Sequence, residues 1–345
     1  MSEDWSIIRL KANRGIMYRT IEKAKDPNDI ISIAMNPNVS INVLKIWSQS
    51  SNPLVRTGVA KNLKTEDEVL NYLKSDDQPN VRVGMASNPK LSAQNLESLS
   101  KDADSSLRQG VAGNVNTTPK LLQILSKDLE SSVRLRVAIN PNTPIQTLKE
   151  LTEDKSSTVR TYVASNPSAT SEILEQIYNS GPTTGGGGAE GDARILIARN
   201  PNTPPYILDV LSVSKEVTFR NGVSRNSNIT NVLIELLMKD QKNEVIAGLL
   251  NNPNCPEKYL VEYSENSEVQ LRSAVAGNPK TSINILNILA KDKSIKVRRA
   301  LAQNFKCPKD LLQILAADKN EEVHLSVLGN VNTPPETILA LLQTT

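Results

Sequence analysis

One asparagine recurs at a fixed interval along the sequence, and this regularity constrains the fold more than any other feature. It stands in segments such as VAINPNTP, and we call it the marker asparagine. The marker asparagines are Asn36, Asn62, Asn88, Asn114, Asn140, Asn166, Asn200, Asn226, Asn252, Asn278, Asn304 and Asn330. Every spacing is 26 residues except one of 34, between Asn166 and Asn200. Self-similarity at one period predicts a solenoid of twelve stacked repeats.

Each repeat contains two helical patterns. Before the marker, apolar residues such as Val133 and Val137 fall on one helix face. Eight and eleven residues after it, every repeat is apolar again, and this i, i+3 spacing also indicates a helix. Proline often follows the marker, so the first helix must end there. Thr143 followed by Pro144 predicts an N-cap with proline at the first position of the second helix.

The repeat string VRxxVAxNPxTPxxxLxxLxxD resembles the leucine-rich repeat variant family, which is close to HEAT repeats. Residues 133–154 match it almost throughout, and the resemblance extends from Asp29 to the C-terminus. It implies an all-α fold, a right-handed helical-repeat solenoid of paired short helices, with a 3₁₀-helix as an option for one of each pair. Some family members carry a cysteine-rich iron–sulfur segment at the N-terminus. Residues 1–28 contain no cysteine, so that property does not carry over.

The repeats and their interruption predict the domain organisation. We expect a helical N-terminal cap over residues 1–28 and repeats 1–6 over residues 29–180. A glycine-rich insertion at 181–191 is expected to be a flexible tether, because consecutive glycines lose much backbone entropy on ordering. Repeats 7–12 follow over residues 192–345.

Composition narrows the class of protein. Aromatic residues make up only 3% of the chain and the net charge is +3, so neither a thick aromatic core nor a strongly basic nucleic-acid surface is indicated. Cys255 and Cys307 are too few and too far apart for a disulfide framework. No apolar run reaches the length of a signal peptide or a membrane span. These features predict a cytoplasmic protein without membrane contact.

Arginine stands six residues before the marker in most repeats, and aspartate often stands six residues before that arginine. The aspartate–arginine pairs are Asp76 and Arg82, Asp102 and Arg108, Asp128 and Arg134, Asp154 and Arg160, and Asp292 and Arg298. A row of guanidinium groups could contact phosphates. HEAT repeats use the same spacing as a structural ladder, and the resemblance implies that role here, with each aspartate pairing with the arginine that follows it.

The marker asparagine allows two interpretations. A row of exposed amides would bind a peptide backbone. A buried side chain that caps the first helix and bonds into the next repeat is simpler, because asparagine readily bonds within its own turn. We therefore expect a structural role.

Function in a repeat protein is expected where repeats depart from their consensus. Four residues before the marker, most repeats have a small residue, but the middle repeats have larger ones, and just before two markers arginine replaces a small or neutral residue. The resulting candidate binding residues are Arg136, Tyr162, Leu196, Arg199 and Arg225. Tyrosine and arginine are enriched at binding hot spots. The alternative is that these residues only adjust packing around the irregular sixth repeat.

Catalytic chemistry is not indicated. His324, the one histidine, occupies the arginine position of its repeat, and both cysteines occupy the usual threonine position after the marker. The glycine-rich insertion lacks the Lys-Ser/Thr that follows a phosphate-binding loop. We predict no catalytic residues, no metal site, no cofactor and no small-molecule substrate.

Together these features predict a non-catalytic binding scaffold whose extended surface binds a protein or peptide. The alternative partner is nucleic acid, bound through basic residues of the central repeats. The discriminating property is salt dependence, which is steep when several phosphates are bound.

Overall fold

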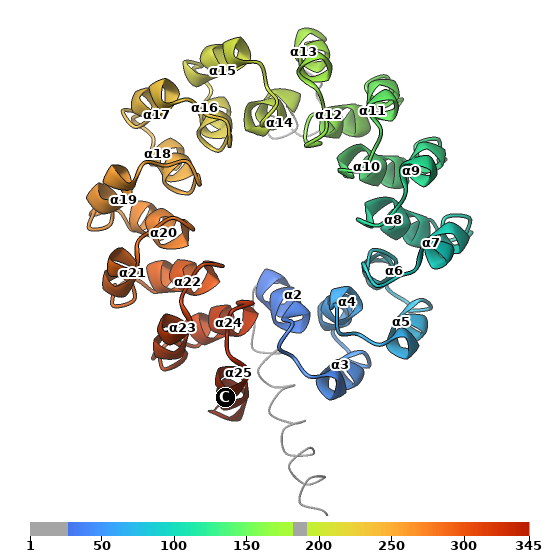
Figure 1. Cartoon of the computed structure of the whole chain (residues 1–345), viewed down its shortest axis with the longest axis horizontal. Helices are drawn as coiled ribbons and strands as arrows, with labels where there is room; N and C mark the ends of the chain where they lie inside the picture. Colours follow the sequence, from blue (N-terminus) through green and yellow to red (C-terminus); the bar gives the residue numbers. More distant parts are fainter. Residues whose placement is uncertain (1–26, 182–191, 345) are drawn as a thin grey trace, which may run out of the picture. The chain divides into compact units, whose positions relative to one another are not determined.

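A computed structural model describes residues 27–181 and 192–344, which form α-helices joined by short turns (Figure 1). Within these ranges there is no strand and no 3₁₀-helix, so both helices of each pair are α-helical. The fold is an all-α helical-repeat solenoid, as predicted. Nearly all of the expected N-terminal cap and of the glycine-rich insertion lies outside the described residues.

Each repeat contributes a first helix that ends at or just before its marker asparagine. The first helices are α2 (Pro27–Met35), α4 (Pro53–Lys61), α6 (Pro79–Ala86), α8 (Ser105–Gly113), α10 (Ser131–Ile139), α12 (Ser157–Val163), α14 (Ala193–Arg199), α16 (Val217–Ser224), α18 (Asn243–Leu250), α20 (Val269–Gly277), α22 (Ile295–Gln303) and α24 (Glu321–Gly329). Many consecutive first helices pack on each other, as α8 and α10 do.

The second helices pack on first helices, as α9 does on α8 and α10. The second helices are α3 (Ile41–Trp47), α5 (Asp67–Leu73), α7 (Ala93–Leu99), α9 (Pro119–Leu125), α11 (Ile145–Leu151), α13 (Ser171–Asn179), α15 (Pro205–Ser212), α17 (Asn231–Leu237), α19 (Glu257–Tyr263), α21 (Ile283–Leu289), α23 (Lys309–Ala316) and α25 (Pro335–Thr344). Helices this short are not stable alone, so burial of apolar side chains between the two layers must hold them. In repeat 5, Val133, Val137 and Leu148 are fully buried in this thin core.

The turn between the two helices corrects one prediction. The marker Asn140 leaves the helical conformation at ψ 125° and ends α10. The N-cap of α11 is Pro144, not Thr143. The Thr143 hydroxyl instead donates to the Val137 carbonyl at 2.6 Å. The same carbonyl also accepts from the Asn140 amide at 3.1 Å, so the threonine ties the turn to the end of α10.

The chain divides into two compact units. Unit 1 comprises residues 1–90 and 279–345, whose described helices are α2–α6 and α21–α25. Unit 2 comprises residues 91–278 and contains α7–α20. These units do not coincide with the two groups of six repeats that the insertion suggested. In unit 2 the first helices form the concave layer and the second helices the outer one (Figure 1).

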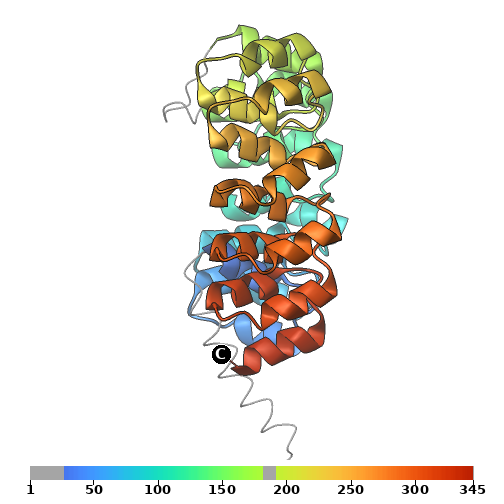
Figure 2. The same ribbon diagram turned by 90° about the vertical axis from the view of Figure 1, so that its left-hand side faces the viewer.

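Unit 1 joins the two ends of the repeat array. Helix α2 of the first repeat packs on α24 of the last, and the two lie side by side in Figure 1. In Figure 2, blue N-terminal helices and red C-terminal helices lie at the same end of the view. Asn36 donates to the carbonyl oxygens of Leu328 and Asn330 at 2.6 and 3.0 Å. The first repeat of unit 1 therefore has a neighbour on each side of α2, since α4 packs on its other side.

Candidate partner-binding face

The marker asparagines are part of the interior. In repeat 5, Asn140 is 2% exposed, and its Nδ2 donates to the carbonyls of Ala112 and Asn114 at 2.8 and 3.0 Å. Its Oδ1 accepts from the Asn142 amide at 2.9 Å. The same pair of bonds to the preceding repeat is made by Asn62, Asn88, Asn166, Asn200, Asn226, Asn252, Asn278 and Asn330. The amides thus bond backward and not into the next repeat, and they are not an exposed peptide-binding row.

The arginine ladder is also engaged, but the carboxylate that pairs with each arginine is not that of the expected aspartate. Arg134 donates to the carbonyl oxygen of Asp128 at 2.7 Å, whereas its Nε pairs with the carboxylate of Asp154 at 2.7 Å. The carboxylate of Asp128 binds the preceding arginine, Arg108, at 2.7 Å. Asp128 therefore joins two arginines, one through its side chain and one through its backbone, and Asp76 and Asp154 do the same.

The five expected aspartate–arginine pairs all meet through that backbone carbonyl. The carbonyl bonds are Arg82 to Asp76, Arg108 to Asp102, Arg134 to Asp128, Arg160 to Asp154 and Arg298 to Asp292, at 2.6 to 2.8 Å. Carboxylate pairs within one repeat join Arg56 to Asp76, Arg108 to Asp128, Arg134 to Asp154, Arg220 to Asp240 and Arg298 to Asp318. These guanidinium groups are therefore committed to the fold.

The ladder carboxylates are held in the ionised form. Burial alone raises the pKa of Asp154, but hydrogen bonds from Arg134 and from the Ser156 amide outweigh it, so the pKa lies below its ordinary value. The pKa of Asp128 is lowered in the same way by Arg108 and the Glu130 amide, against the opposing effect of burial. Breaking such a pair would leave a poorly solvated charge behind.

The ladder changes beside the insertion and at the last repeat. Arg160 keeps its carbonyl bond to Asp154, but Ser180 stands where the next aspartate would be. After the insertion, Arg194 pairs with Asp192 at 2.5 Å. In the last repeat His324 bonds through Nε2 to the Asp318 carbonyl, so it substitutes for the arginine of the ladder.

The candidate binding residues lie on four successive first helices of unit 2, α10, α12, α14 and α16 or its C-cap. We call Arg136, Tyr162, Leu196, Arg199 and Arg225 the central face. Tyr162 is 41% exposed, Arg199 and Arg225 are exposed, and Arg136 and Leu196 are half-buried. Among the described residues, none of the three arginines takes part in an ion pair. The structure thus brings all five onto adjacent helices of the concave layer.

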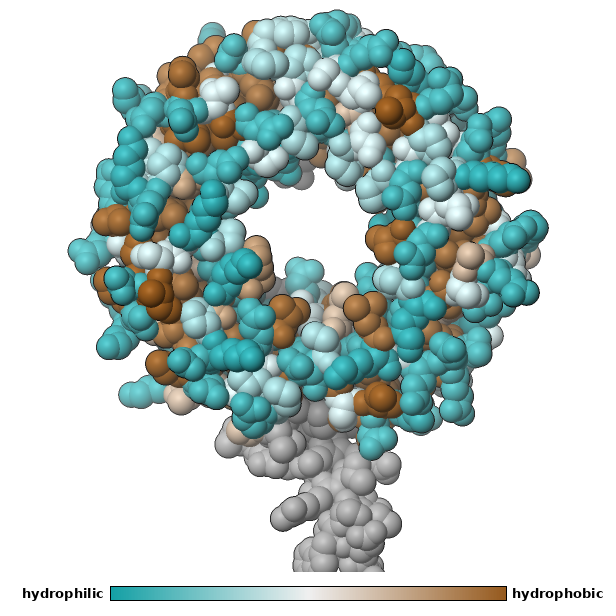
Figure 3. All heavy atoms as spheres, viewed as in Figure 1, coloured by the Kyte–Doolittle hydropathy of each residue, from teal (hydrophilic) through white to brown (hydrophobic). Residues whose placement is uncertain are grey.

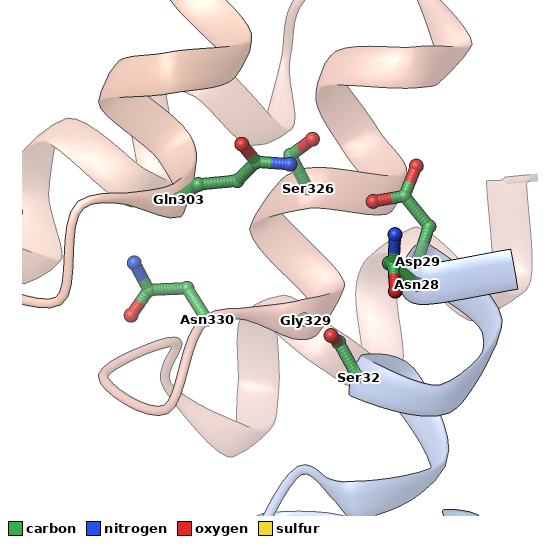
Figure 4. Close-up of a pocket in the computed structure, with 7 residues that line it drawn as sticks. All are labelled: Asn28, Asp29, Ser32, Gln303, Ser326, Gly329 and Asn330. Carbon is green, nitrogen blue, oxygen red and sulfur yellow. The ribbon is translucent and has the colours of Figure 1, made fainter. Parts of the chain in front are cut away.

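A different arrangement surrounds an arginine on the same layer of unit 1. Arg299 of α22 pairs with Asp29 at 2.9 Å and with Glu322 at 3.2 Å. Beside it lies a polar pocket of about 450 Å³ between α2, α22 and α24, into which Ser326, Gln303 and Ser32 point (Figure 4). Its charged lining residue, Asp29, is already paired with Arg299, so the pocket offers polar but neutral contacts.

The outer layer carries features that the sequence pattern did not single out. Exposed apolar side chains stand ten residues after the marker at Tyr72, Ile124, Val210, Leu236, Ile288 and Ile314. In the view of Figure 3, brown apolar groups are small and separated by hydrophilic side chains. A groove of about 370 Å³ between α7 and α9 is lined by Leu96, Leu121 and Ile124. The sequence did contain a signal for these exposed residues, namely an apolar residue between the two core positions of the second helix.

Residues capable of nucleophilic or metal chemistry are dispersed. The thiols of Cys255 and Cys307 are free and buried, and burial raises their pKa to about 11 and about 12. In the described ranges, no three His, Cys, Asp or Glu side chains gather in a way that could hold a metal ion. Across the same residues, no helix has the length and apolar character needed to span a membrane.

Comparison with solved structures gives likenesses to other chains. A solved structure described as "a leucine-rich repeat variant with a novel repetitive protein structural motif" matches with a TM-score of 0.34 and 19% identity. The match covers 66% of this chain and 87% of that chain. No protein-family model matches the sequence, and no curated protein matches it.

Proposed function

We propose that the chain is a non-catalytic scaffold that binds a protein or peptide partner on the central face of unit 2. The proposal rests on a difference between residues that are bonded within the fold and residues that are exposed to solvent. The ladder arginines and marker asparagines are bound inside the fold, whereas Tyr162, Arg199 and Arg225 remain exposed. Tyrosine and arginine supply much of the binding energy at protein interfaces, because they combine apolar area with directed hydrogen bonds.

Nucleic acid is the less favoured partner. Binding along a phosphate backbone requires many cationic side chains, each of which contributes to a steep salt dependence. The ladder would have supplied them, but guanidinium groups such as those of Arg108 and Arg134 are paired with buried aspartates. A net charge of +3 over 345 residues adds little general attraction.

The surroundings of the two cysteines and of the one histidine support a non-catalytic role in the cytoplasm. A buried thiol with a raised pKa has little thiolate and is a poor nucleophile, and this describes Cys255 and Cys307. His324 is committed to the Asp318 carbonyl. Two unpaired cysteines suit a reducing compartment.

The proposal is tested by affinity capture from the native lysate, with and without nuclease. The wild-type chain is compared with Arg136→Glu/Arg225→Glu. The matched control is Lys127→Glu/Lys215→Glu, which makes the same change of net charge at two exposed positions outside the first helices.

We expect the wild type and the control to retain one defined protein in both nuclease arms, and the central-face variant to lose it. Equal recovery by all three proteins would place the binding surface elsewhere. Recovery of nucleic acid, with proteins that disappear after nuclease, would replace the protein-scaffold proposal with the alternative.

A further inference from the structure

The central face has charge of one sign. At the positions one, four and five residues before each marker, unit 2 has three charged residues, Arg136, Arg199 and Arg225, and no acidic residue. These positions lie toward the C-terminal ends of the first helices, where the helix dipole favours a positive charge. The dipole explains how the fold accommodates these arginines, but it provides no localised counter-charge.

Two of the arginines are neighbours because their helices approach closely. Arg199 ends α14, and Arg225 is the C-cap residue of α16, the next first helix. Gly222 of α16 packs on α14 so tightly that a Cβ there would lie 2.7 Å from the Ala198 Cβ and 3.3 Å from the Ile195 carbonyl oxygen. The glycine therefore allows the two arginine-bearing helix ends to lie side by side.

The two guanidinium groups affect each other. Burial, followed by the positive charge of Arg225, lowers the pKa of Arg199. The Nε of Arg225 donates to Asn221 Oδ1 at 3.0 Å, which orients the side chain while leaving its terminal nitrogens uncommitted. Two like charges thus lie close together, one of them partly desolvated, with no acidic partner among the described residues.

We infer that Arg199 and Arg225 together form a carboxylate-binding site for an acidic peptide segment of the partner, an inference that rests on the proposed function. A carboxylate between two guanidinium groups would neutralise their repulsion and accept several charge-assisted hydrogen bonds in parallel. Partial desolvation strengthens such bonds, since the interaction is less screened than in water.

The surroundings favour a peptide over a nucleic-acid strand. Leu196 lies on the same helix as Arg199, one turn before it, and Tyr162 occupies the equivalent position on α12. They offer apolar and aromatic contact area for the side chains that flank an acidic residue. Beyond the pair, Arg136 is the one further arginine of the central face, which is too few cations to follow a phosphate backbone along the layer.

The test measures fluorescence anisotropy of labelled peptides with the full chain. The probes are hexaglutamate, hexaglutamine as an uncharged control, and single-stranded hexathymidylate. The variants are Arg199→Gln/Arg225→Gln, the conservative Arg199→Lys/Arg225→Lys, and the control Lys127→Gln/Lys215→Gln. Neither arginine stabilises the fold through an ion pair, so the variants should stay folded, and circular dichroism checks this.

We expect wild type to prefer hexaglutamate over hexaglutamine by about tenfold or more, which corresponds to one or two charge-assisted hydrogen bonds. The glutamine variant should lose that preference, the lysine variant should regain part of it, and the control should keep it. An equal loss in the control, or tighter binding of hexathymidylate than of hexaglutamate, would overturn the inference. Capture of a protein through the central face together with no hexaglutamate preference would reject this site while leaving the scaffold proposal intact.

Discussion

Arg134 and Arg136 lie in the same helix, α10, but belong to two different regions of unit 2. Arg134 belongs to the row of paired ladder arginines and aspartates, which we call the ladder edge. It is 4% exposed and bonds to the Asp154 carboxylate and the Asp128 carbonyl. Arg136, on the central face, is half-buried. Its Cδ would lie 3.6 Å from a Cβ added at Gly113 in the preceding repeat. Arg134 is fully engaged by the protein, whereas Arg136 makes no hydrogen bond or ion pair with the described residues.

The comparison teaches that the role of an arginine in this solenoid depends on whether acidic residues lie within reach of it. The residue type alone does not decide that role. Arg299 in unit 1 makes the same point from the opposite direction. It occupies the exposed layer of first helices, yet Asp29 and Glu322 neutralise it, so we assign it to the structure and not to binding.

The largest effect should come from removing a ladder arginine. Arg134→Ala leaves the buried Asp154 carboxylate without its guanidinium partner, and we expect a loss of about 3 kcal/mol in the free energy of unfolding. Arg136→Ala removes no ion pair and should change it by less than about 0.5 kcal/mol. Urea unfolding of both variants measures the difference. Equal losses in the free energy of unfolding would show that Arg134 and Arg136 contribute alike to stability.

A smaller effect is expected from filling the close approach that brings Arg199 and Arg225 together. Gly222→Ala should destabilise the chain by about 1–2 kcal/mol, because the added methyl group collides with Ala198 and overpacking is costly. Gly84→Ala in unit 1 is the matched control, since its nearest neighbours lie 3.4 Å away. There the higher helix propensity of alanine should leave stability unchanged or raise it by up to about 1 kcal/mol. Thermal unfolding compares the two, and destabilisation by both would indicate a general intolerance of alanine at this position.

Acid should weaken the ladder edge and leave the central face unaffected. The pKa values of Asp128 and Asp154 are lower in the folded chain than in the unfolded one. Their contribution is therefore present above the unfolded value, near pH 4, and is lost as the pH falls through the lowered folded values. For each pair the loss should be smaller than that caused by Arg134→Ala, because a protonated carboxyl group still accepts a hydrogen bond.

The measurement is the urea midpoint between neutral pH and about pH 3. Asp154→Asn should show a smaller acid-induced drop than wild type, since it has one fewer carboxylate to protonate. Arg136→Ala should show the wild-type drop. An unchanged drop in Asp154→Asn would mean that the acid sensitivity arises outside the ladder.

The sequence was sufficient to predict the repeat and its two helices, because both are set by local periodicity. Departures from that periodicity selected the residues of the central face, whose role in binding stays a prediction. It could not identify the ladder partners. Arg134 stands six residues after Asp128 and 20 before Asp154, and these two separations add up to one 26-residue period. A periodic pattern cannot distinguish a contact from its copy one repeat away, and the direction of the marker-asparagine bonds was missed for the same reason.

The contact of α2 with α24 could not be predicted for a different physical reason. It depends on how small rotations between successive helix pairs accumulate, and no single repeat encodes that sum. The bonds of Asn36 to Leu328 and Asn330 nevertheless reproduce the pattern that Asn62 makes to Ala34 and Asn36. The interface between repeats is therefore a property of the repeat surface and needs no covalent link.

The smallest predicted effect compares arginines on the same layer of the two units. Arg299→Ala removes bonds to Asp29 and Glu322 and should cost about 1 kcal/mol, since the pair is partly exposed. Amide hydrogen exchange should quicken first in α2, which Asp29 anchors to α22. Arg199→Ala should change stability by less than about 0.5 kcal/mol, in the stabilising direction, because it removes a like charge beside Arg225. A clear loss of stability in Arg199→Ala would show that an internal partner already neutralises this arginine, and the central face would then have no uncommitted charge to offer an acidic peptide.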